Sequence, residues 1–297
     1  FILVACINIV VAANAGGAFS PFGDITTLMV WQKAIETPQG PVDFWSFFAL
    51  FLPALINWLL PALIMSFSFS NEKPHGAATN EIMKCGAKRI IGFFLLTIAA
   101  AVSFHNFLQL PPFIGMLTGL SFLQIFGYYL KVTGGNCGRK DKNAATLGNP
   151  RGFDVYSKVA KAEWDTLLFF YGVVLCVGGL GFIGYLAMAS EMMYVGWGAS
   201  QPNIAIGVMS AIVDNIPVMF AVLTMMPDMS LGQWLLVTLT AGVGGSLLSI
   251  GSAAGVALMG QARGQYTFFG HLKWTPVIAL GYAASIATHF WINSALF

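Results

Sequence analysis

One stretch of the chain, residues 14–27, places oxygen-bearing side chains inside an apolar run. It reads Asn-Ala-Gly-Gly-Ala-Phe-Ser-Pro-Phe-Gly-Asp-Ile-Thr-Thr, and its glycines and proline disfavour a continuous helix. In hydrocarbon, backbone groups freed by such a break need partners in protein or in a wet cavity, and a buried acid indicates function. We therefore predict a broken membrane helix beside an internal polar site. The alternative is a simple kink from which the acid reaches the membrane interface. The oxygen-bearing residues are Asn14, Ser20, Asp24, Thr26 and Thr27.

Residues 201–227 form a second apolar segment with polar residues at its centre. Ser210 precedes an Asp-Asn-Ile-Pro sequence that starts at Asp214 and continues with Asn215. Each arm on either side of this sequence, if helical, covers about half of the hydrocarbon thickness. We predict a re-entrant hairpin whose tip carries these polar residues. The alternative is a single kinked span with one buried acid.

The glycine pattern of the first break recurs near the end of the chain, in the apolar run 231–259. When residues 16–24 are laid over residues 244–252, the glycines coincide and Asp24 falls on Ser252, with Ser249 nearby. Counting the loops gives the two broken helices opposite directions across the membrane. Two broken helices of inverted topology are typical of secondary transporters whose site lies near the membrane midplane.

Composition indicates a multispanning membrane protein of the all-α class. Hydrophobic residues make up 57% of the chain, charged residues make up 9%, and the mean hydropathy is +0.75. A soluble domain has about 25% charged residues. The apolar segments are continuous, which predicts helices and not β-barrel strands. Further spans are expected at residues 44–69, 90–107, 113–130, 164–189 and 274–296.

Basic residues predict the orientation of these spans. If the long hydrophilic loop 131–161 is cytoplasmic, thirteen of the fourteen Lys and Arg residues lie inside, as the positive-inside rule requires. This count holds only if the segment 201–227 enters and leaves on one face. We expect residues 1–70 to end a first inverted repeat and residues 71–297 to form the second. Because Phe1 lies within an apolar run without a basic segment or initiator Met, we expect a further part of the protein to precede it.

The polar residues of the breaks and the hairpin tip are hard oxygen ligands, which suit a small cation such as Na⁺. Burial favours the protonated form of an acid, whereas a bound cation favours the charged form, so protons and Na⁺ would compete for one site. Such competition predicts antiport. We expect no enzyme activity, no cofactor and no nucleic-acid partner. The expected Na⁺ ligands are Asp24, Thr27, Asp214, Asn215, Ser249 and Ser252.

Together these three motifs resemble the NhaD-type sodium/proton antiporters of the ion transporter superfamily. The resemblance implies exchange of Na⁺ or Li⁺ for H⁺ in a bacterial inner membrane, inverted repeats, and a homodimer. It also implies that Glu163 matches an acidic position of the family and that further family acids lie in a first hairpin before Phe1. An anion transporter on the same scaffold is the main alternative. An intramembrane aspartyl protease using Asp24 and Asp214 is disfavoured, because the chain has no Gly-x-Gly-Asp motif.

Overall fold

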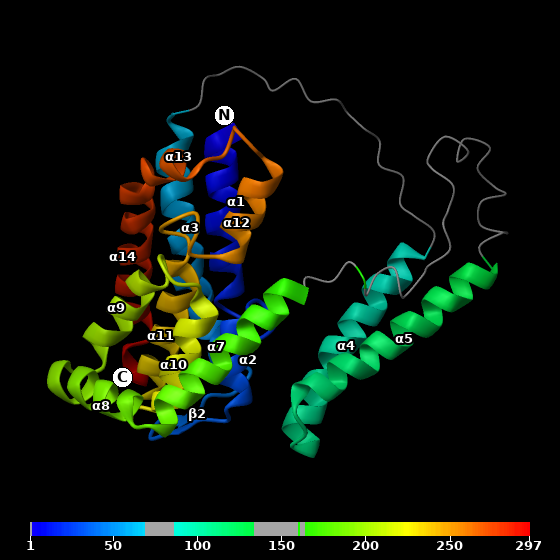
Figure 1. The fold of residues 1–297 in the computed structure, drawn as a ribbon, viewed down its shortest axis with the longest axis horizontal. Helices are drawn as coiled ribbons and strands as arrows, with labels where there is room; N and C mark the ends of the chain where they lie inside the picture. Colours follow the sequence, from blue (N-terminus) through cyan, green and yellow to red (C-terminus); the bar gives the residue numbers. More distant parts are fainter. Residues whose placement is uncertain (1, 69–85, 134–159, 161–163) are drawn as a thin grey trace. The chain divides into compact units, whose positions relative to one another are not determined.

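The computed structural model describes residues 2–68, 86–133, 160 and 164–297 (Figure 1). The described chain is mainly helical, as predicted, and it divides into a larger unit (residues 1–71 and 168–297) and a smaller one (residues 72–167). Four described helices are long and apolar enough to cross a membrane, and a bent pair would make a fifth. Glu163 and almost all of the predicted loop 131–161 lie outside the described residues.

The smaller unit contains two antiparallel helices, α4 (Ala87–Leu108) and α5 (Pro112–Thr133). They approach closely at glycines of α5, because a Cβ added to Gly115 would lie 2.5 Å from the Ala101 Cα. Small residues allow this kind of close helix contact in membranes. The predicted spans 90–107 and 113–130 are confirmed, each extended by a few residues.

The larger unit begins with α1 (Ile2–Gly17) and α2 (Ile25–Gln32), the two halves of the first broken helix. A short antiparallel hairpin, β1 (Glu36–Thr37) and β2 (Gly40–Pro41), follows them. The remaining elements of the chain are η1 (Ser46–Leu50), α3 (Phe51–Ser66), α7 (Trp164–Phe182), α8 (Tyr185–Ser190), η4 (Glu191–Val195), α9 (Ser200–Met209), α10 (Asn215–Met225), α11 (Leu231–Gly244), α12 (Ala253–Gln261), α13 (Phe268–Leu272), α14 (Thr275–Ile292) and η5 (Ser294–Leu296).

Helices α3 and α14 of the larger unit lie against each other along much of their length. A Cβ on Gly281 of α14 would lie 2.5 Å from the Asn57 carbonyl of α3, so the two backbones nearly touch. At the end of α14, Asn293 Nδ2 donates a 3.0 Å hydrogen bond to the Ala49 carbonyl. The predicted spans 44–69 and 274–296 are therefore present as η1–α3 and α14.

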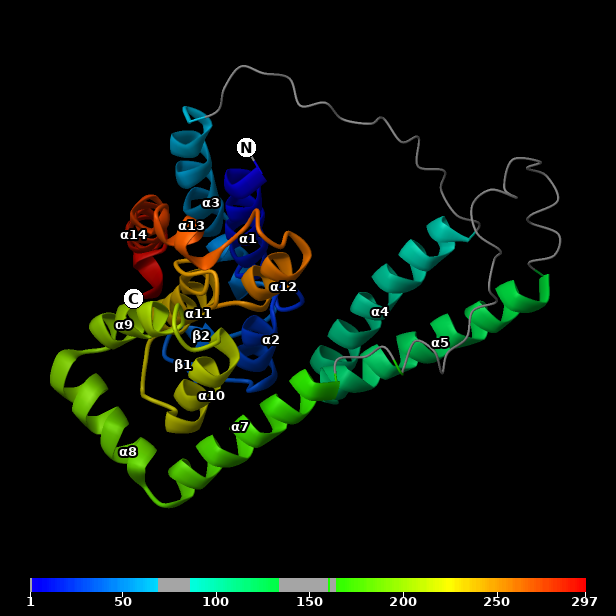
Figure 2. The same ribbon diagram turned by 45° about the horizontal axis from the view of Figure 1, so that its top comes forward.

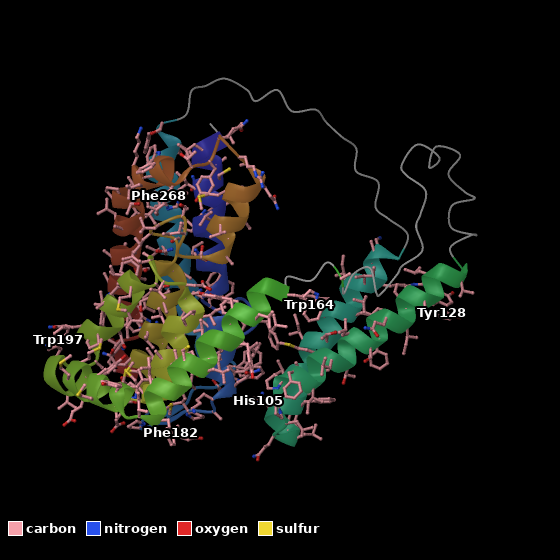
Figure 3. The ribbon with its side chains drawn as sticks, viewed as in Figure 1. His105, Tyr128, Trp164, Phe182, Trp197 and Phe268 are labelled. Atoms are coloured by element: carbon pink, nitrogen blue, oxygen red, sulfur yellow. The ribbon has the colours of Figure 1, made fainter. Side chains whose placement is uncertain are left out.

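The segment expected as a single span over 164–189 is bent by 79° between α7 and α8. Phe182 lies at this bend (Figure 3), and Gly184 follows it with φ = 88°, a left-handed conformation that glycine adopts without steric cost. The helix beyond the bend continues as η4 to Val195. The glycines of this segment thus interrupt a run that its hydropathy alone predicts to be straight.

The hairpin predicted over 201–227 is present as α9 and α10, and its geometry is re-entrant. At one end of the α9–α11 pair, Gln233 Nε2 of α11 donates to Ser200 Oγ of α9 at 2.7 Å. At the other end, Ser210 Oγ donates to the Ala241 carbonyl at 2.7 Å. Helices α9 and α11 therefore start at the same end and run parallel. Helix α10, which lies between them in the sequence, must bring the chain back from the far end of α9 to the end where α11 starts. The chain therefore enters and leaves this segment on the same side.

The two broken helices of the larger unit run in opposite directions. The first half of the first broken helix, α1, contacts the second half of the second, α12, and a Cβ on Gly270 of α13, which follows α12, would lie 2.9 Å from Leu3 Cδ1. Beyond the end of the first broken helix, Gln39 Oε1 accepts a 3.2 Å hydrogen bond from Leu231 N, where the second begins. Figures 1 and 2 show the result, with α12 beside α1 and α10 beside α2. This antiparallel crossing is the arrangement that inverted repeats produce.

Candidate ion-binding site

The first break is closed by hydrogen bonds from its own residues. Asp24 is the N-cap of α2, with its Oδ1 2.6 Å from Ile25 N. The fully buried Thr27 hydroxyl accepts from Asp24 N at 3.3 Å and donates to the carbonyl of Ser20 at 2.8 Å or of Asp24 at 2.7 Å. Asp24 and Thr27 together form a capping box. The break therefore has a defined shape, because Thr27 supports the carbonyls that the unwound turn exposes.

Two side chains also donate hydrogen bonds to the Asp24 carboxylate. Its Oδ2 accepts from Thr26 Oγ1 at 3.0 Å and from Asn215 Nδ2 at 2.7 Å. The last of these bonds joins the first broken helix to the hairpin tip, and Asn215 is only 5% exposed. These donors come from the capping turn and from the hairpin tip, so they hold the Asp24 side chain in one orientation.

The second break has the same local geometry as the first. Ser252 caps α12 at φ −148° and ψ 150°, close to the φ −140° and ψ 157° of Asp24. A Cβ on Gly17 would meet the Asp24 Cβ at 3.1 Å, and one on Gly245 would meet the Ser252 Cβ at 3.2 Å. The register that pairs residues 16–24 with 244–252 therefore also holds in three dimensions.

The hairpin tip brings the second acid to the site. Asp214 caps α10 through a 3.0 Å hydrogen bond from Asn215 N to its Oδ1. The tip rests on the second break, because a Cβ on Gly251 would lie 2.6 Å from the Ala211 carbonyl. The Ser210 hydroxyl points to α11 instead, where it donates to the Ala241 carbonyl. Ser210 thus fixes the hairpin on α11, and its proton is not free to bind an acceptor in the site.

The two breaks are joined directly by Asn14. Its Nδ2 donates a 3.1 Å hydrogen bond to Ser252 Oγ, and both side chains are buried. The Asn14–Ser252 bond and the Asn215–Asp24 bond connect the first broken helix to the second and to the hairpin. The structure therefore brings together Asn14, Asp24, Thr26, Thr27, Asp214, Asn215 and Ser252, with Ser20 contributing its carbonyl.

Ser249 is the unusual member of the second break. It is fully buried, and its hydroxyl has no hydrogen-bond partner within the described part of the chain. Such a group is costly unless a ligand, water or ion satisfies it. Asp214 is only partly buried and accepts a single hydrogen bond from the described residues. Within these same residues there is no group of three or more His, Cys, Asp or Glu side chains that could hold a metal ion.

Sequence reasoning missed the residues that support the second break from outside it. His271 is fully buried in α13, and its Nε2 lies 2.9 Å from the Ser246 carbonyl. Thr275 Oγ1 donates to the Leu247 carbonyl at 2.8 Å. The only signal in the sequence is the presence of a histidine shortly after a glycine-rich break, which is weak.

Fold and site together define a class of protein. Antiparallel broken helices, a re-entrant hairpin and convergent oxygen groups at the breaks are the features of secondary transporters with inverted repeats.

Comparisons with known proteins agree with this class. The family model of the CitMHS citrate transporters matches residues 2–242. The chain is 59% identical to the Na⁺/H⁺ antiporter NhaD of Alkalimonas amylolytica over all of its own length and 62% of that protein. It is 61% identical to the Na⁺/H⁺ antiporter NhaD of Vibrio parahaemolyticus, over 95% of this chain and 69% of that protein. The sodium/proton antiporter 1 of Arabidopsis thaliana is 32% identical over 97% of the chain. No solved structure matches it.

The chain belongs to the CitMHS family and, within it, to the NhaD-type Na⁺/H⁺ antiporters. It spans 62% of the length of the Alkalimonas relative and 61% of that of the NhaD antiporter of Halomonas elongata.

Proposed function

We propose that the protein exchanges Na⁺ for H⁺ across a membrane, using the oxygen groups at the crossing of its two broken helices. The observation that carries this proposal is the Asn215–Asp24 hydrogen bond of 2.7 Å, which joins the hairpin tip, where Asp214 precedes Asn215, to the first break. None of the site residues is a Lys or Arg. Two carboxylates with hydroxyl and amide neighbours favour a cation over an anion.

The two acids have different surroundings, which suggests different roles. Asp24 accepts hydrogen bonds from its own capping turn and from Asn215, and we assign it the role of a fixed negative charge. Asp214 accepts one hydrogen bond from the described residues and has unused acceptor capacity, so we assign it the exchange of H⁺ for Na⁺. Ser249, with its unpartnered hydroxyl, is a further candidate ligand for Na⁺.

Exchange then follows from competition at this site. A proton on Asp214 removes the charge that Na⁺ needs, and a bound Na⁺ opposes protonation of the same carboxylate. If the site opens alternately to the two sides, each opening releases one ion and takes up the other. Movement of the broken helices relative to the hairpin would alternate the access.

The finer assignments are proposals as well. The names of the bacterial relatives support Na⁺ and H⁺ as the transported ions, whereas a bacterial inner membrane as the location rests on the family resemblance. Transport of Li⁺, assembly as a homodimer, and an accessory role for Glu163 rest on the family resemblance.

Anion transport is the alternative that two observations favour. The matching family model is named for citrate transporters, and three half-helices begin at the site, where partial positive charge attracts anions. However, the N-termini of α2 and α10 are already capped by Asp24 and Asp214. An anion would face two carboxylates there, which disfavours it electrostatically.

Everted membrane vesicles containing the complete protein test the proposal. With a pH gradient set in advance, added NaCl should collapse the gradient, whereas potassium citrate at the same ionic strength should not. Vesicles without the protein are the control. Collapse of the gradient by citrate without any response to Na⁺ would support the alternative.

A further inference from the structure

The two breaks have equivalent positions, but their exposed carbonyls are hydrogen-bonded by different parts of the chain. In the first break, Thr27 of α2 donates to the carbonyls of the unwound turn. The register of the repeats places Gly255 at the equivalent position of α12. A Cβ at Gly255 would lie 2.0 Å from the Ser249 carbonyl, so the second break has no room for a threonine there. Its exposed carbonyls need support from another element.

Helix α13 supplies that support. His271 Nε2 lies 2.9 Å from the Ser246 carbonyl, and Nδ1 lies 2.8 Å from the Tyr266 hydroxyl. His271 is fully buried and Tyr266 is 2% exposed. The start of α13, where Phe268 is labelled in Figure 3, is closed by Thr267 Oγ1, which accepts from Gly270 N at 3.2 Å. The imidazole is therefore held at both nitrogens and has one orientation.

The partners of His271 also define its tautomer. A carbonyl can only accept, so Nε2 carries a proton and donates to Ser246 O. Nδ1 then accepts from the Tyr266 hydroxyl in the neutral ring. Burial lowers the pKa of His271, and the hydrogen bonds to the break carbonyls oppose this effect. A neutral ring donating one hydrogen bond to the break matches this environment.

We propose that His271, oriented by Tyr266, is a positioning residue that holds the second break in the shape needed to present Ser249 and Ser252 to Na⁺. The bonded carbonyl belongs to Ser246, a few residues before both hydroxyls, in an unwound turn that lacks the internal support of the first break. His271 itself does not touch the ion. The proposal rests on the proposed Na⁺/H⁺ exchange for its effect on transport, but not for its effect on the shape of the break.

His289 offers a matched control within the same unit. It is also fully buried, and its Nε2 also lies near a carbonyl of the second broken helix, that of Gly232 at 3.0 Å. Gly232 is in the first turn of α11, far along the helix from the break. Replacing either histidine removes a buried hydrogen bond of the same kind, and only the bond made by His271 reaches the turn that carries Ser249 and Ser252.

The test compares His271→Leu, His271→Gln and His289→Leu in the complete protein. We expect His271→Leu to weaken the apparent Na⁺ affinity of exchange about tenfold with little change in the rate at saturating Na⁺, because a buried carbonyl loses its donor. His271→Gln, whose amide can donate to Ser246 O, should restore most of this affinity. His289→Leu should leave the affinity unchanged even if it lowers thermal stability.

Deuterium uptake by residues 245–252 is the second readout. His271→Leu should increase it, and His289→Leu should not. Unchanged Na⁺ affinity and unchanged uptake in His271→Leu, or equal effects of the two leucine variants, would overturn the proposal. If the wild-type protein showed no Na⁺-dependent exchange, the proposed function would fail, and uptake would still decide whether His271 supports the break.

Discussion

The hydrogen bond between Asp24 and Asn215 can be tested by swapping the two residues, first one at a time and then together. In Asp24→Asn, the amide keeps one oxygen for Ile25 N, and Asn is as good an N-cap as Asp. Its new NH₂ group, however, faces Asn215 Nδ2, which loses its acceptor 2.7 Å away. In Asn215→Asp, two carboxylates face each other instead. In the double variant, the amide now at position 24 donates and the carboxylate now at position 215 accepts, so the bond is restored in the opposite sense.

The magnitude follows from the charge and burial of this bond. A hydrogen bond to a charged group contributes about 1.5–3 kcal/mol, and a buried donor left without a partner costs a similar amount. Asn215 is 5% exposed, so water replaces the lost acceptor poorly. Each single variant should therefore lower the midpoint of thermal unfolding by about 3–12 °C. The double variant should regain at least half of this loss.

The assay combines thermal unfolding of purified protein with exchange in everted vesicles. Asp24→Asn should lose exchange, because bound Na⁺ would lose an anionic neighbour. The double variant keeps the charge at the site and should regain part of the exchange. If the double variant is no more thermally stable than the less stable of the two single variants, residues 24 and 215 do not form the bond that the structure shows. Wild-type exchange by Asp24→Asn would refute the fixed-charge role of Asp24.

Three further predictions follow from the site. Asp214→Asn should abolish exchange with little loss of thermal stability, since its carboxylate accepts one hydrogen bond from the described residues; exchange at the wild-type rate would show that another group carries the proton. Ser249→Ala removes a buried hydroxyl that has no hydrogen-bond partner among the described residues, so thermal stability should stay the same or rise. The apparent Na⁺ affinity should fall, and an unchanged affinity would exclude Ser249 as a ligand. Gly255→Ala should lower expression and stability, because its Cβ would lie 2.0 Å from the Ser249 carbonyl. Gly16→Ala is the control and should be neutral, because nothing lies within 4 Å of its Cβ. Fluorescence-detected size exclusion measures both variants, and equal effects would contradict the packing of the second break.

The broken helices and the hairpin could be predicted because membrane helices rarely tolerate what these segments contain. Glycines, a proline and acids within apolar runs leave few arrangements in which all backbone groups are satisfied. The internal match of residues 16–24 to 244–252 also predicted the register that the geometry of Gly17 and Gly245 confirms. Local composition and repetition were sufficient for these features.

The contacts that complete the site could not be predicted in the same way. The Asn14–Ser252 and Asn215–Asp24 bonds join residues that are far apart in the sequence, and no periodicity relates their positions. The bend after Phe182 depends on a left-handed glycine, Gly184, in a run whose hydropathy is that of an ordinary span. His271 was missed because its contribution lies in a tertiary contact with the Ser246 carbonyl.

The central claim is that Na⁺ and H⁺ compete for one site containing Asp214, and Na⁺ binding measured as a function of pH tests it most directly. Calorimetric titration of the purified complete protein with NaCl, over a series of pH values, gives the apparent affinity and the protons released. Competition predicts that the affinity falls as the pH is lowered, approaching about tenfold per pH unit, with about one proton released per Na⁺ bound. An affinity for Na⁺ that stays constant over the whole pH range, without proton release, would contradict a shared site.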